Sequence, residues 1–380
     1  MLVSIVVHNL SNNCLGRAHV LAEILEKSFE VEVAGPDLGG GVWEPLANER
    51  SYINLDTNAS VLEFPKKARK VANQLNGDVV LAVKPHMTSY GIGLFKRYFC
   101  DTPLVLDIDD WELGFKYESK SRLQAHLEGV QNLNNVNTIN YTSLLEKLAS
   151  RADACIVSNR FLQKRFGGTI VPHVRDTDVF NPSKYQTEVI RTELDLPQNK
   201  TIVLFSGTPR THKGIDNLVT AINSIERHDL LGLIVGVDDT PYSHYLNDIA
   251  GENIQLVGRQ PFSKLPKWIA AADIITVPQK RSPATRGQLP AKLFDAMAMG
   301  KPIIGTEVSD IPLILDDCGI VVEPDSSDAI SEAITKLHEN PALREELGRK
   351  AREQCVEEYS YDAFEPVLED VIENAFKNHN

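Results

Sequence analysis

The sequence predicts an α/β protein of two domains, each a parallel β-sheet with helices on both faces. Its 380 residues are too many for one ordinary hydrophobic core and suit two. Short β-branched runs alternate with helix-like segments, an order typical of βαβ units and therefore of parallel sheets. The strand segments are continuously apolar, as expected for strands buried on both faces of a sheet.

The second half of the chain shows this alternation most clearly. Helix-like segments such as 213–225 and 290–300 separate runs of strand length. The strands expected there are 201–207, 231–236, 253–258, 273–278, 301–306 and 319–324.

The first half repeats the pattern with longer interruptions. The first apolar run has strand length and no basic flank, which predicts a β-strand rather than a signal peptide. Residues 39–62 are rich in turn formers and are expected to form loops, whereas 111–140 fit either a helix pair or a mobile loop. The strands expected there are 2–8, 29–35, 78–85, 102–110, 152–159 and 168–173.

A polar segment at 181–199, with a proline near each end, predicts the boundary between the domains. We place it at 185/186, which gives domains over 1–185 and 186–360, followed by residues 361–380. Doubly wound sheets bind ligands at the carboxyl ends of their strands. Two Rossmann-like domains of this kind are therefore expected to face a ligand-binding cleft.

Composition and charge narrow the class of protein. Apolar residues make up 42% and charged residues 24%, which is a globular composition without an apolar run long enough to span a membrane. The net charge of −13 argues against a nucleic-acid partner. Five scattered cysteines predict neither zinc nor a disulfide framework and fit a reducing cytoplasm. Cations nevertheless gather in the second half, which indicates a small anionic ligand: Arg210, Lys213, Arg259, Lys280, Arg281, Arg286 and Lys292.

The turn after the strand at 201–207 is the most informative segment. Gly207 permits close backbone approach, and a helix begins near Lys213, where free N–H groups favour an anion. Arg210 and His212 add side-chain donors. The segment fits a diphosphate cradle, but it fits an ordinary βα turn with solvated cations equally well. It matches neither GxxxxGK[ST] nor GxGxxG, which disfavours a Walker NTPase and a standard dinucleotide fold.

Three segments in order resemble one enzyme family. G-x-x-R-x-x-K-G at 207–214, PAKLFDAMAMGKPII at 290–304 and PHVRDTDVFNP at 172–182 are similar to the family-4 retaining glycosyltransferases, group 1, which have the GT-B fold. The resemblance implies a nucleoside-diphosphate-sugar as donor substrate, with no cofactor and no metal. It also implies that 1–185 binds the acceptor, that 186–360 binds the donor, and that 361–380 form a helix crossing back to the N-terminal domain.

The resemblance also implies the donor contacts. Lys213 matches the family's diphosphate lysine, Arg210 is the candidate for its arginine, which usually follows the glycine directly, and Gly207 lies beside the phosphates. Asp295 matches, one methylene shorter, the second glutamate of E-x7-E, which usually holds the ribose. The first glutamate falls at Gly287, so this chain departs from the family near the reacting sugar. The remaining candidates for donor contact are Arg259 at the nucleobase, Gly16 in the first loop, Arg286 and Lys292. Arg286 and Lys292 fit either donor contacts or solvated charges on a helix face.

On the acceptor side, the family's His-Asp pair falls on Asp109 and Asp110, which we take as the candidate catalytic residues. A carboxylate there can stabilise positive charge on the sugar or take the acceptor's proton. The acids also resemble a DxD metal motif, and caps of the next segment are an alternative interpretation of them. Lys84 and His86 follow another strand and are expected to line the acceptor side.

The sequence thus favours transfer of a sugar to a hydroxyl of an unknown glycan, lipid or small molecule, and the family resemblance implies transfer with retention. A nucleotide-sugar epimerase of the same fold and a non-catalytic nucleotide-sugar-binding protein remain as alternatives. Basic segments at 64–71 and 161–168 fit either solvated faces or peripheral contact with the inner face of a membrane. The expected location is the cytoplasm.

Overall fold

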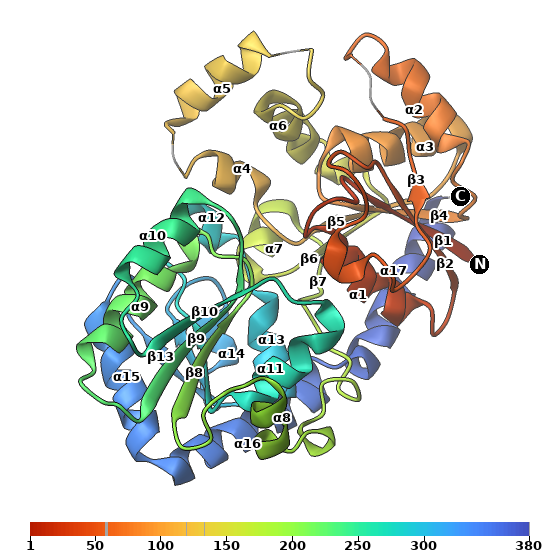
Figure 1. Ribbon diagram of the computed structural model, residues 1–380. Helices are drawn as coiled ribbons and strands as arrows, with labels where there is room; N and C mark the ends of the chain where they lie inside the picture. Colours follow the sequence, from red (N-terminus) through yellow and green to blue (C-terminus); the bar gives the residue numbers. More distant parts are fainter. Residues whose placement is uncertain (58–59, 119, 133, 380) are drawn as a thin grey trace. The chain divides into compact units, whose positions relative to one another are not determined.

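Both halves of the chain form a parallel β-sheet, which confirms the predicted fold class (Figure 1). The computed structural model describes residues 1–57, 60–118, 120–132 and 134–379. The expected loops at 39–62 and 111–140 and the closing segment 361–380 include residues 58–59, 119, 133 and 380, which lie outside the described residues.

The chain divides into two compact units. The first unit comprises Met1–His173, Arg286–Leu289 and Asp362–Asn380, and the second comprises Val174–Thr285 and Pro290–Tyr361. We placed the boundary at 185/186, whereas the second unit begins at Val174. The reason is local packing, because Arg352 donates hydrogen bonds to the carbonyl oxygens of Thr177 and Phe180 at 2.8 and 2.7 Å. The assignment of acceptor and donor roles to 1–185 and 186–360 stays a prediction.

Among the described residues, the first unit holds a seven-stranded sheet in the order β3-β2-β1-β4-β5-β6-β7, with every pair parallel. The strand order reverses between β1 and β4, which is where doubly wound sheets bind ligands. The strands are β1 (Leu2–Val7), β2 (Glu30–Gly35), β3 (Ile53–Asn54), β4 (Val79–Val83), β5 (Leu104–Ile108), β6 (Ala154–Val157) and β7 (Thr169–Ile170).

Helices follow most of these strands. The segment 111–140, for which a helix pair or a loop was expected, contains α4, α5 and the start of α6. The helices are α1 (Leu15–Leu25), α2 (Phe64–Ala72), α3 (Ile92–Cys100), α4 (Glu112–Lys116), α5 (Arg122–Gln131), α6 (Ile139–Lys147), α7 (Arg160–Phe166) and α17 (Tyr361–His379), with short turns η1 (Glu44–Leu46), η2 (Met87–Gly91) and η3 (Ala149–Arg151).

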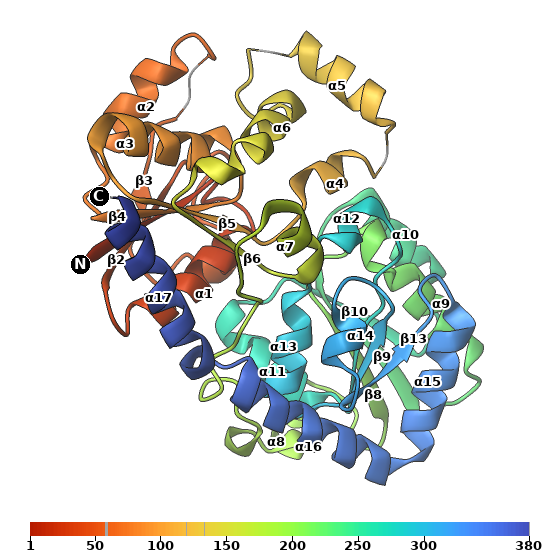
Figure 2. The same cartoon turned by 180° about the vertical axis from the view of Figure 1, so that it is seen from behind.

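Helix α17 returns the chain to the first unit. From Asp362 onward its residues belong to that unit, and Lys27 forms ion pairs with Asp362 and Glu365 (Figure 2). At the other end of the helix, His379 Nδ1 lies 3.2 Å from Asp153 Oδ2. The closing helix is therefore held along its length by the N-terminal part of the chain.

The second unit repeats the architecture with a six-stranded sheet in the order β10-β9-β8-β11-β12-β13, again parallel throughout the described residues. Its order reverses between β8 and β11. The strands are β8 (Thr201–Ser206), β9 (Leu230–Val237), β10 (Ile254–Gly258), β11 (Ile274–Val277), β12 (Ile303–Thr306) and β13 (Gly319–Val322).

Nine helices cover this sheet in the described residues, and α9 and α15 lie side by side on it (Figures 1 and 2). They are α8 (Thr187–Glu193), α9 (Ile215–Ser224), α10 (Pro241–Ile249), α11 (Leu265–Ala271), α12 (Pro283–Arg286, ending in the first unit), α13 (Ala291–Ala298), α14 (Ile311–Ile314), α15 (Ser327–Glu339) and α16 (Pro341–Glu358), with turns η4 (Pro182–Lys184), η5 (Thr211–Lys213) and η6 (Phe262–Lys264).

The apolar runs explain why these segments become strands. Central strands such as β4 and β11 are buried along their whole length, since helices cover both faces of each sheet. No helix within the described ranges combines the length and the apolar character that a membrane span requires.

Candidate functional site

A glycine-rich turn follows β8 at the point where the strand order of the second unit reverses. Gly207 takes a φ of 119°, η5 follows, and Gly214 precedes α9 with a φ of 66°. The first N–H groups of a helix lack partners within it and carry partial positive charge. The turn therefore presents a backbone surface suited to an anion.

Two positions require glycine because neighbouring backbone passes too close for a side chain. A Cβ at Gly214 would lie 1.9 Å from the carbonyl oxygen of Pro278, and one at Gly236 would lie 2.8 Å from the carbonyl carbon of Gly207. Both also have positive φ, which strains other residues. The ends of β8, β9 and β11 thus meet at this turn with no room for side chains.

Two predicted arginines converge on one carboxylate. Nη1 of Arg210 and Nη2 of Arg259 each lie 3.1 Å from Oδ2 of Asp238. The Asp238 side chain is 8% exposed, whereas the arginine side chains are 45% and 47% exposed. The sequence indicated both cations but not the aspartate that holds them. Their exposed guanidinium groups retain donors for an external anion.

Two predicted lysines lie at the same turn. Lys213 Nζ donates to the carbonyl oxygen of Thr208 at 2.7 Å. Lys292 reaches over from α13, with Nζ 3.5 Å from the ring centroid of Phe205, and a Cβ at Gly207 would lie 3.4 Å from that ammonium nitrogen. The structure therefore brings Gly207, Lys213 and Lys292 together on the second unit.

The electrostatics of the turn are those of crowded cations. Burial, followed by repulsion from Lys213, lowers the pKa of Lys292 well below its ordinary value, although Asp295 acts in the opposite direction. Burial and the neighbouring cations lower the pKa of His212 to about 3. A bound anion would relieve this repulsion and raise both pKa values.

Asp295, also on α13, already has a partner. It forms a buried ion pair with Arg175, whose Nη1 donates to the carbonyl oxygen of Val174 at 2.8 Å. The side chains of Arg175 and Asp295 are 4% and 5% exposed. Arg175 was not among the predicted site residues, and a partner so distant in sequence leaves no local pattern.

In the first unit, carboxylates gather around one lysine at the carboxyl ends of β4 and β5. Lys84 Nζ lies 3.2 Å from Asp109 Oδ1, 2.7 Å from Asp110 Oδ2 and 2.7 Å from Glu112 Oε1. His86 Nε2 lies 3.1 Å from Glu112 Oε2. Lys84 adopts a φ of 69°, a conformation that costs about 1–3 kcal/mol in a non-glycine residue and is concentrated at functional sites.

These groups have displaced pKa values. Burial raises the pKa of Asp109, and burial against the pull of Lys84 raises the pKa of Asp110 to about 6. Glu112 behaves in the opposite way, because Lys84 and His86 outweigh its burial and hold its pKa well below the ordinary value. Three carboxyls share one ammonium, so the two aspartates take up a proton at a higher pH than ordinary aspartates do.

The first turn of α1, which follows β1, carries Arg17 and Gly16. Arg17 is buried and pairs with Asp107 at 2.8 Å, and it donates to the carbonyl oxygens of Val171 and Pro172 at 2.8 Å. Asp107 is thereby occupied by an arginine. Gly16, predicted as a donor contact, has no positive φ, and a Cβ there would meet only Trp43 at 3.7 Å.

The residues around the missing glutamate belong to the first unit. The carbonyl oxygen of Gly287 accepts a hydrogen bond from the Trp111 N–H at 3.2 Å, and a Cβ at Gly287 would lie 2.4 Å from the Trp111 Cβ. Gln288 Nε2 donates to Asp110 Oδ1 at 3.1 Å. Arg286, predicted as a donor contact, stacks on Phe161 at 5.3 Å. A longer side chain does not fit at position 287, and the next residue places an amide on Asp110.

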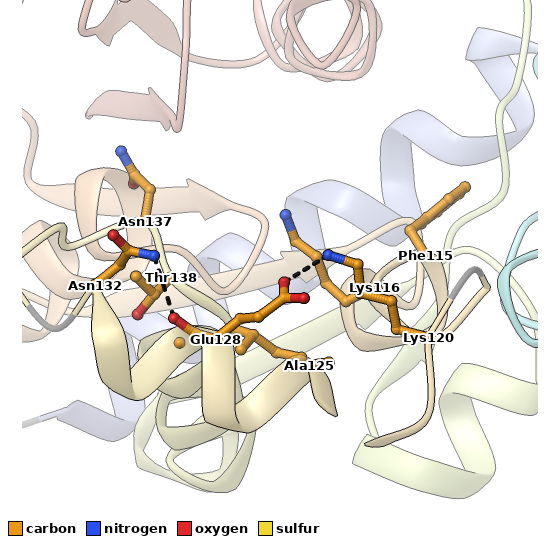
Figure 3. A pocket seen from close by; sticks show the side chains of 10 residues that line it. Phe115, Lys116, Lys120, Ala125, Glu128, Asn132, Asn137 and Thr138 are labelled. Atoms are coloured by element: carbon orange, nitrogen blue, oxygen red, sulfur yellow. Dashed lines mark hydrogen bonds and ion pairs between the residues drawn. The ribbon is translucent and has the colours of Figure 1, made fainter. Parts of the chain in front are cut away.

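A further cavity of about 320 Å³ lies in the first unit between α4, α5 and α6 (Figure 3). Lys120 pairs with Glu128 across it, and Asn132 Nδ2 donates to the carbonyl oxygen of Glu128 at 3.2 Å. The sequence did not indicate this cavity. Its lining is Phe115, Lys116, Lys120, Ala125, Glu128, Gly129, Asn132, Asn137, Thr138 and Ile139.

The two Rossmann-like sheets and the turn at their point of reversal define the class of fold. It is the GT-B fold, shared with the structure of Anabaena HepE in complex with UDP-glucose, at a TM-score of 0.76 and 14% identity over 98% of this chain and 99% of that one. Residues 186–354 match the family model of glycosyl transferases group 1.

Two curated relatives agree with the family. The chain is 28% identical over 254 residues to WcaI of Escherichia coli K12, covering 60% of this chain and 58% of that protein. It is 25% identical over 252 residues to the GDP-mannose-dependent α-(1-6)-phosphatidylinositol monomannoside mannosyltransferase of Mycobacterium tuberculosis H37Rv, covering 60% and 64%. The chain thus matches less than two thirds of the length of either relative.

Proposed function

We propose that the protein transfers a sugar, with retention, from a nucleoside-diphosphate-sugar to an acceptor hydroxyl. The cationic glycine turn of the second unit carries the proposal, since it offers backbone and side-chain donors to a diphosphate within a domain of the glycosyltransferase family. One relative is GDP-mannose-dependent, and one structural neighbour is in complex with UDP-glucose. Both support a nucleotide-sugar donor, and because their bases differ they do not identify the base.

On the donor side, Gly207, Arg210, Lys213 and Lys292 bind the diphosphate. Asp295 accepts from a ribose hydroxyl, and Arg259 lies toward the nucleobase. As the bond to the sugar breaks, negative charge grows on the leaving diphosphate, and prearranged cations stabilise that charge without needing to move. This proposal uses no cofactor and no metal.

On the acceptor side, Asp109 and Asp110 supply the carboxyl chemistry. Lys84 and Gln288 hold their oxygens. A carboxyl with a pKa of about 6 exchanges a proton with an acceptor hydroxyl near neutral pH more readily than an ordinary aspartate. A carboxylate on the same cluster stabilises positive charge on the reacting sugar.

The test starts with a thermal-shift and calorimetric screen of UDP, GDP and ADP, followed by turnover of the matching sugar nucleotides. We expect one nucleotide to raise the melting temperature, and Lys213→Ala to abolish most of that shift. If Lys213→Ala binds every nucleotide as well as the parent protein, the diphosphate assignment is wrong. Incubation without acceptor separates the classes, because an isomerised donor means an epimerase, whereas free nucleotide with transferred or hydrolysed sugar means a transferase.

One observation favours a second candidate, a non-catalytic nucleotide-sugar-binding protein. The packing of Gly287 on Trp111 leaves no room for the glutamate that the family places near the reacting sugar. Tight donor binding with no turnover over a broad panel of glycan, lipid and small-molecule acceptors would support this candidate over the enzyme.

We further propose peripheral contact with an anionic membrane surface through the basic segments 64–71 and 161–168. Lys66, Arg69 and Lys70 are exposed on α2, and Lys164 and Arg165 lie in the last turn of α7. Co-sedimentation with vesicles containing anionic lipid should pellet the protein at low salt and release it at high salt. Failure to pellet at low salt would remove the idea.

A further inference from the structure

The buried guanidinium of Arg175 binds the carboxylate of Asp295, which we assign to the ribose. The side chains of Arg175 and Asp295 are 4% and 5% exposed, and Arg175 Nε donates to Asp295 Oδ1. The guanidinium carbon also lies 5.9 Å from the ring centroid of Phe180. The ion pair engages Oδ1 of Asp295, one of the two oxygens of this carboxylate.

The backbone of Arg175 is held as firmly as its side chain. Its N–H donates to the carbonyl oxygen of Tyr359 at 2.9 Å, and its carbonyl oxygen accepts from the Tyr361 N–H at 3.0 Å. These bonds form a parallel bridge with Ser360. The chain passes from one unit to the other at 173/174 and again at 361/362. Arg175 and Ser360, which pair with each other, lie next to these two crossing points within the second unit.

A second arginine fastens the same segment to the helix that carries Asp295. Arg352, on α16, donates to the carbonyl oxygen of Ala298 at 2.6 Å, near the end of α13. It also donates to the carbonyl oxygens of Thr177 and Phe180. The segment 174–180 is therefore bound to α13 at two places, by a side-chain ion pair at Asp295 and by a shared arginine at Ala298.

We propose that Arg175 is a positioning residue for the donor: its ion pair fixes Asp295 so that the second carboxylate oxygen meets a ribose hydroxyl. The inference rests on the proposed function. Asp295 is one methylene shorter than the glutamate of the family motif, and a short side chain reaches a ligand only from a fixed position. A guanidinium bound to one oxygen provides that fixation.

The same contacts predict a second consequence. Ribose binding at Asp295 strengthens the constraint on Arg175, whose N–H and C=O hold residues 359–361. Occupancy of the donor site should therefore slow amide exchange at Arg175 and Tyr361, because ligand binding to a folded segment lowers the population of its locally open states.

A purely structural ion pair would have a different signature. It would lower stability when broken but would leave the preference for ribose over deoxyribose unchanged. Arg191 provides a matched control, since it is also buried in the second unit and pairs with Asp273 at 2.6 Å, on an element that we assign no ligand.

The experiment measures the affinity of the tightest-binding nucleotide among UDP, GDP and ADP and of its 2′-deoxy and 3′-deoxy forms. The proteins are the parent chain, Arg175→Met, Arg175→Lys, the double variant Arg175→Met/Asp295→Asn and the control Arg191→Met. The double variant leaves no unpaired buried charge, so it is expected to fold where Arg175→Met does not.

We expect the parent to prefer ribose over one deoxy form about tenfold or more, as for a hydrogen bond to a charged group. Arg175→Met and the double variant should lose that preference, Arg175→Lys should regain part of it, and Arg191→Met should keep it. Nucleotide-induced protection of the Arg175 and Tyr361 amides should disappear with the preference.

Two results would overturn the inference in distinguishable ways. If the nucleotide binds and the double variant keeps the full preference for ribose, Asp295 does not hold the ribose and Arg175 is only structural, while the proposed donor site stands. If no nucleotide binds the parent chain, the proposed function and this inference fail together.

Discussion

The corresponding edges of the two sheets carry opposite chemistry. In the second unit, the point where strand order reverses gathers Arg210, Lys213 and Lys292 around a glycine turn, with carboxylates behind them. In the first unit, the corresponding edge gathers Asp109, Asp110 and Glu112 around a single Lys84. One fold thus supplies an excess of cations at one edge and an excess of carboxyls at the other.

The difference shows how each charge excess is tolerated. The cations are partly exposed and the most crowded of them has a lowered pKa, so the edge is relieved by deprotonation or by an external anion. The carboxyls are largely buried and are compensated by an internal ammonium, that of Lys84. The carboxyl-rich edge of the first unit is therefore neutralised by a side chain of the protein. The cation-rich edge of the second unit is suited to neutralisation by an anionic ligand.

The largest expected effect is the removal of that internal ammonium. Lys84→Met leaves three carboxyls in a buried site without a cation, which should lower the free energy of unfolding by about 3–5 kcal/mol at pH 7. The loss should shrink toward pH 5, because the aspartates can take up protons. Urea unfolding at both pH values measures it. Lys292→Met is the control and should cost little, since it removes a cation from a crowded group; equal losses in both variants would erase the contrast.

The next effect concerns the backbone at two glycines, one in each unit. Gly214→Ala should destabilise the protein by about 1–3 kcal/mol, because its Cβ would overlap the carbonyl oxygen of Pro278. Gly16→Ala, in the first turn of α1 in the first unit, should be neutral or stabilise that helix by about 0.5–1 kcal/mol. Thermal unfolding distinguishes them. A stable Gly214→Ala variant would mean that this turn lacks the tight approach on which the anion site depends.

A smaller effect is proton uptake by the cationic edge. Lys292 has a lowered pKa, so a bound diphosphate should favour its charged form, and nucleotide affinity should rise as pH falls. Calorimetry at pH 8 in two buffers of different ionisation enthalpy should detect uptake of up to about one proton per nucleotide. Lys292→Arg, which stays charged, should bind without uptake, and His212→Asn should leave the uptake unchanged. Uptake that persists in Lys292→Arg would assign the proton elsewhere.

The sequence predicted what repeats locally and missed what depends on distant partners. The two parallel sheets and the turn after β8 are visible as apolar runs and as a glycine followed by cations. By contrast, Arg175 lies 120 residues from Asp295, and Asp238, in the turn after β9, binds Arg210 and Arg259. Such pairs leave no periodic pattern, because the sheet order, not the spacing in sequence, brings them together.

The smallest effect we expect is at Gln288, the residue beside the missing glutamate. Its amide donates to Asp110 and so favours the charged carboxylate. Gln288→Leu should raise the pKa of Asp110 further above its present value of about 6, at a cost near 1 kcal/mol or less in stability at pH 8. Gln288→Glu should raise it more, since a second carboxylate would face the first. NMR titration of the Asp110 carboxyl gives both pKa values. An unchanged pKa in both variants would mean that Gln288 does not influence the carboxyl cluster.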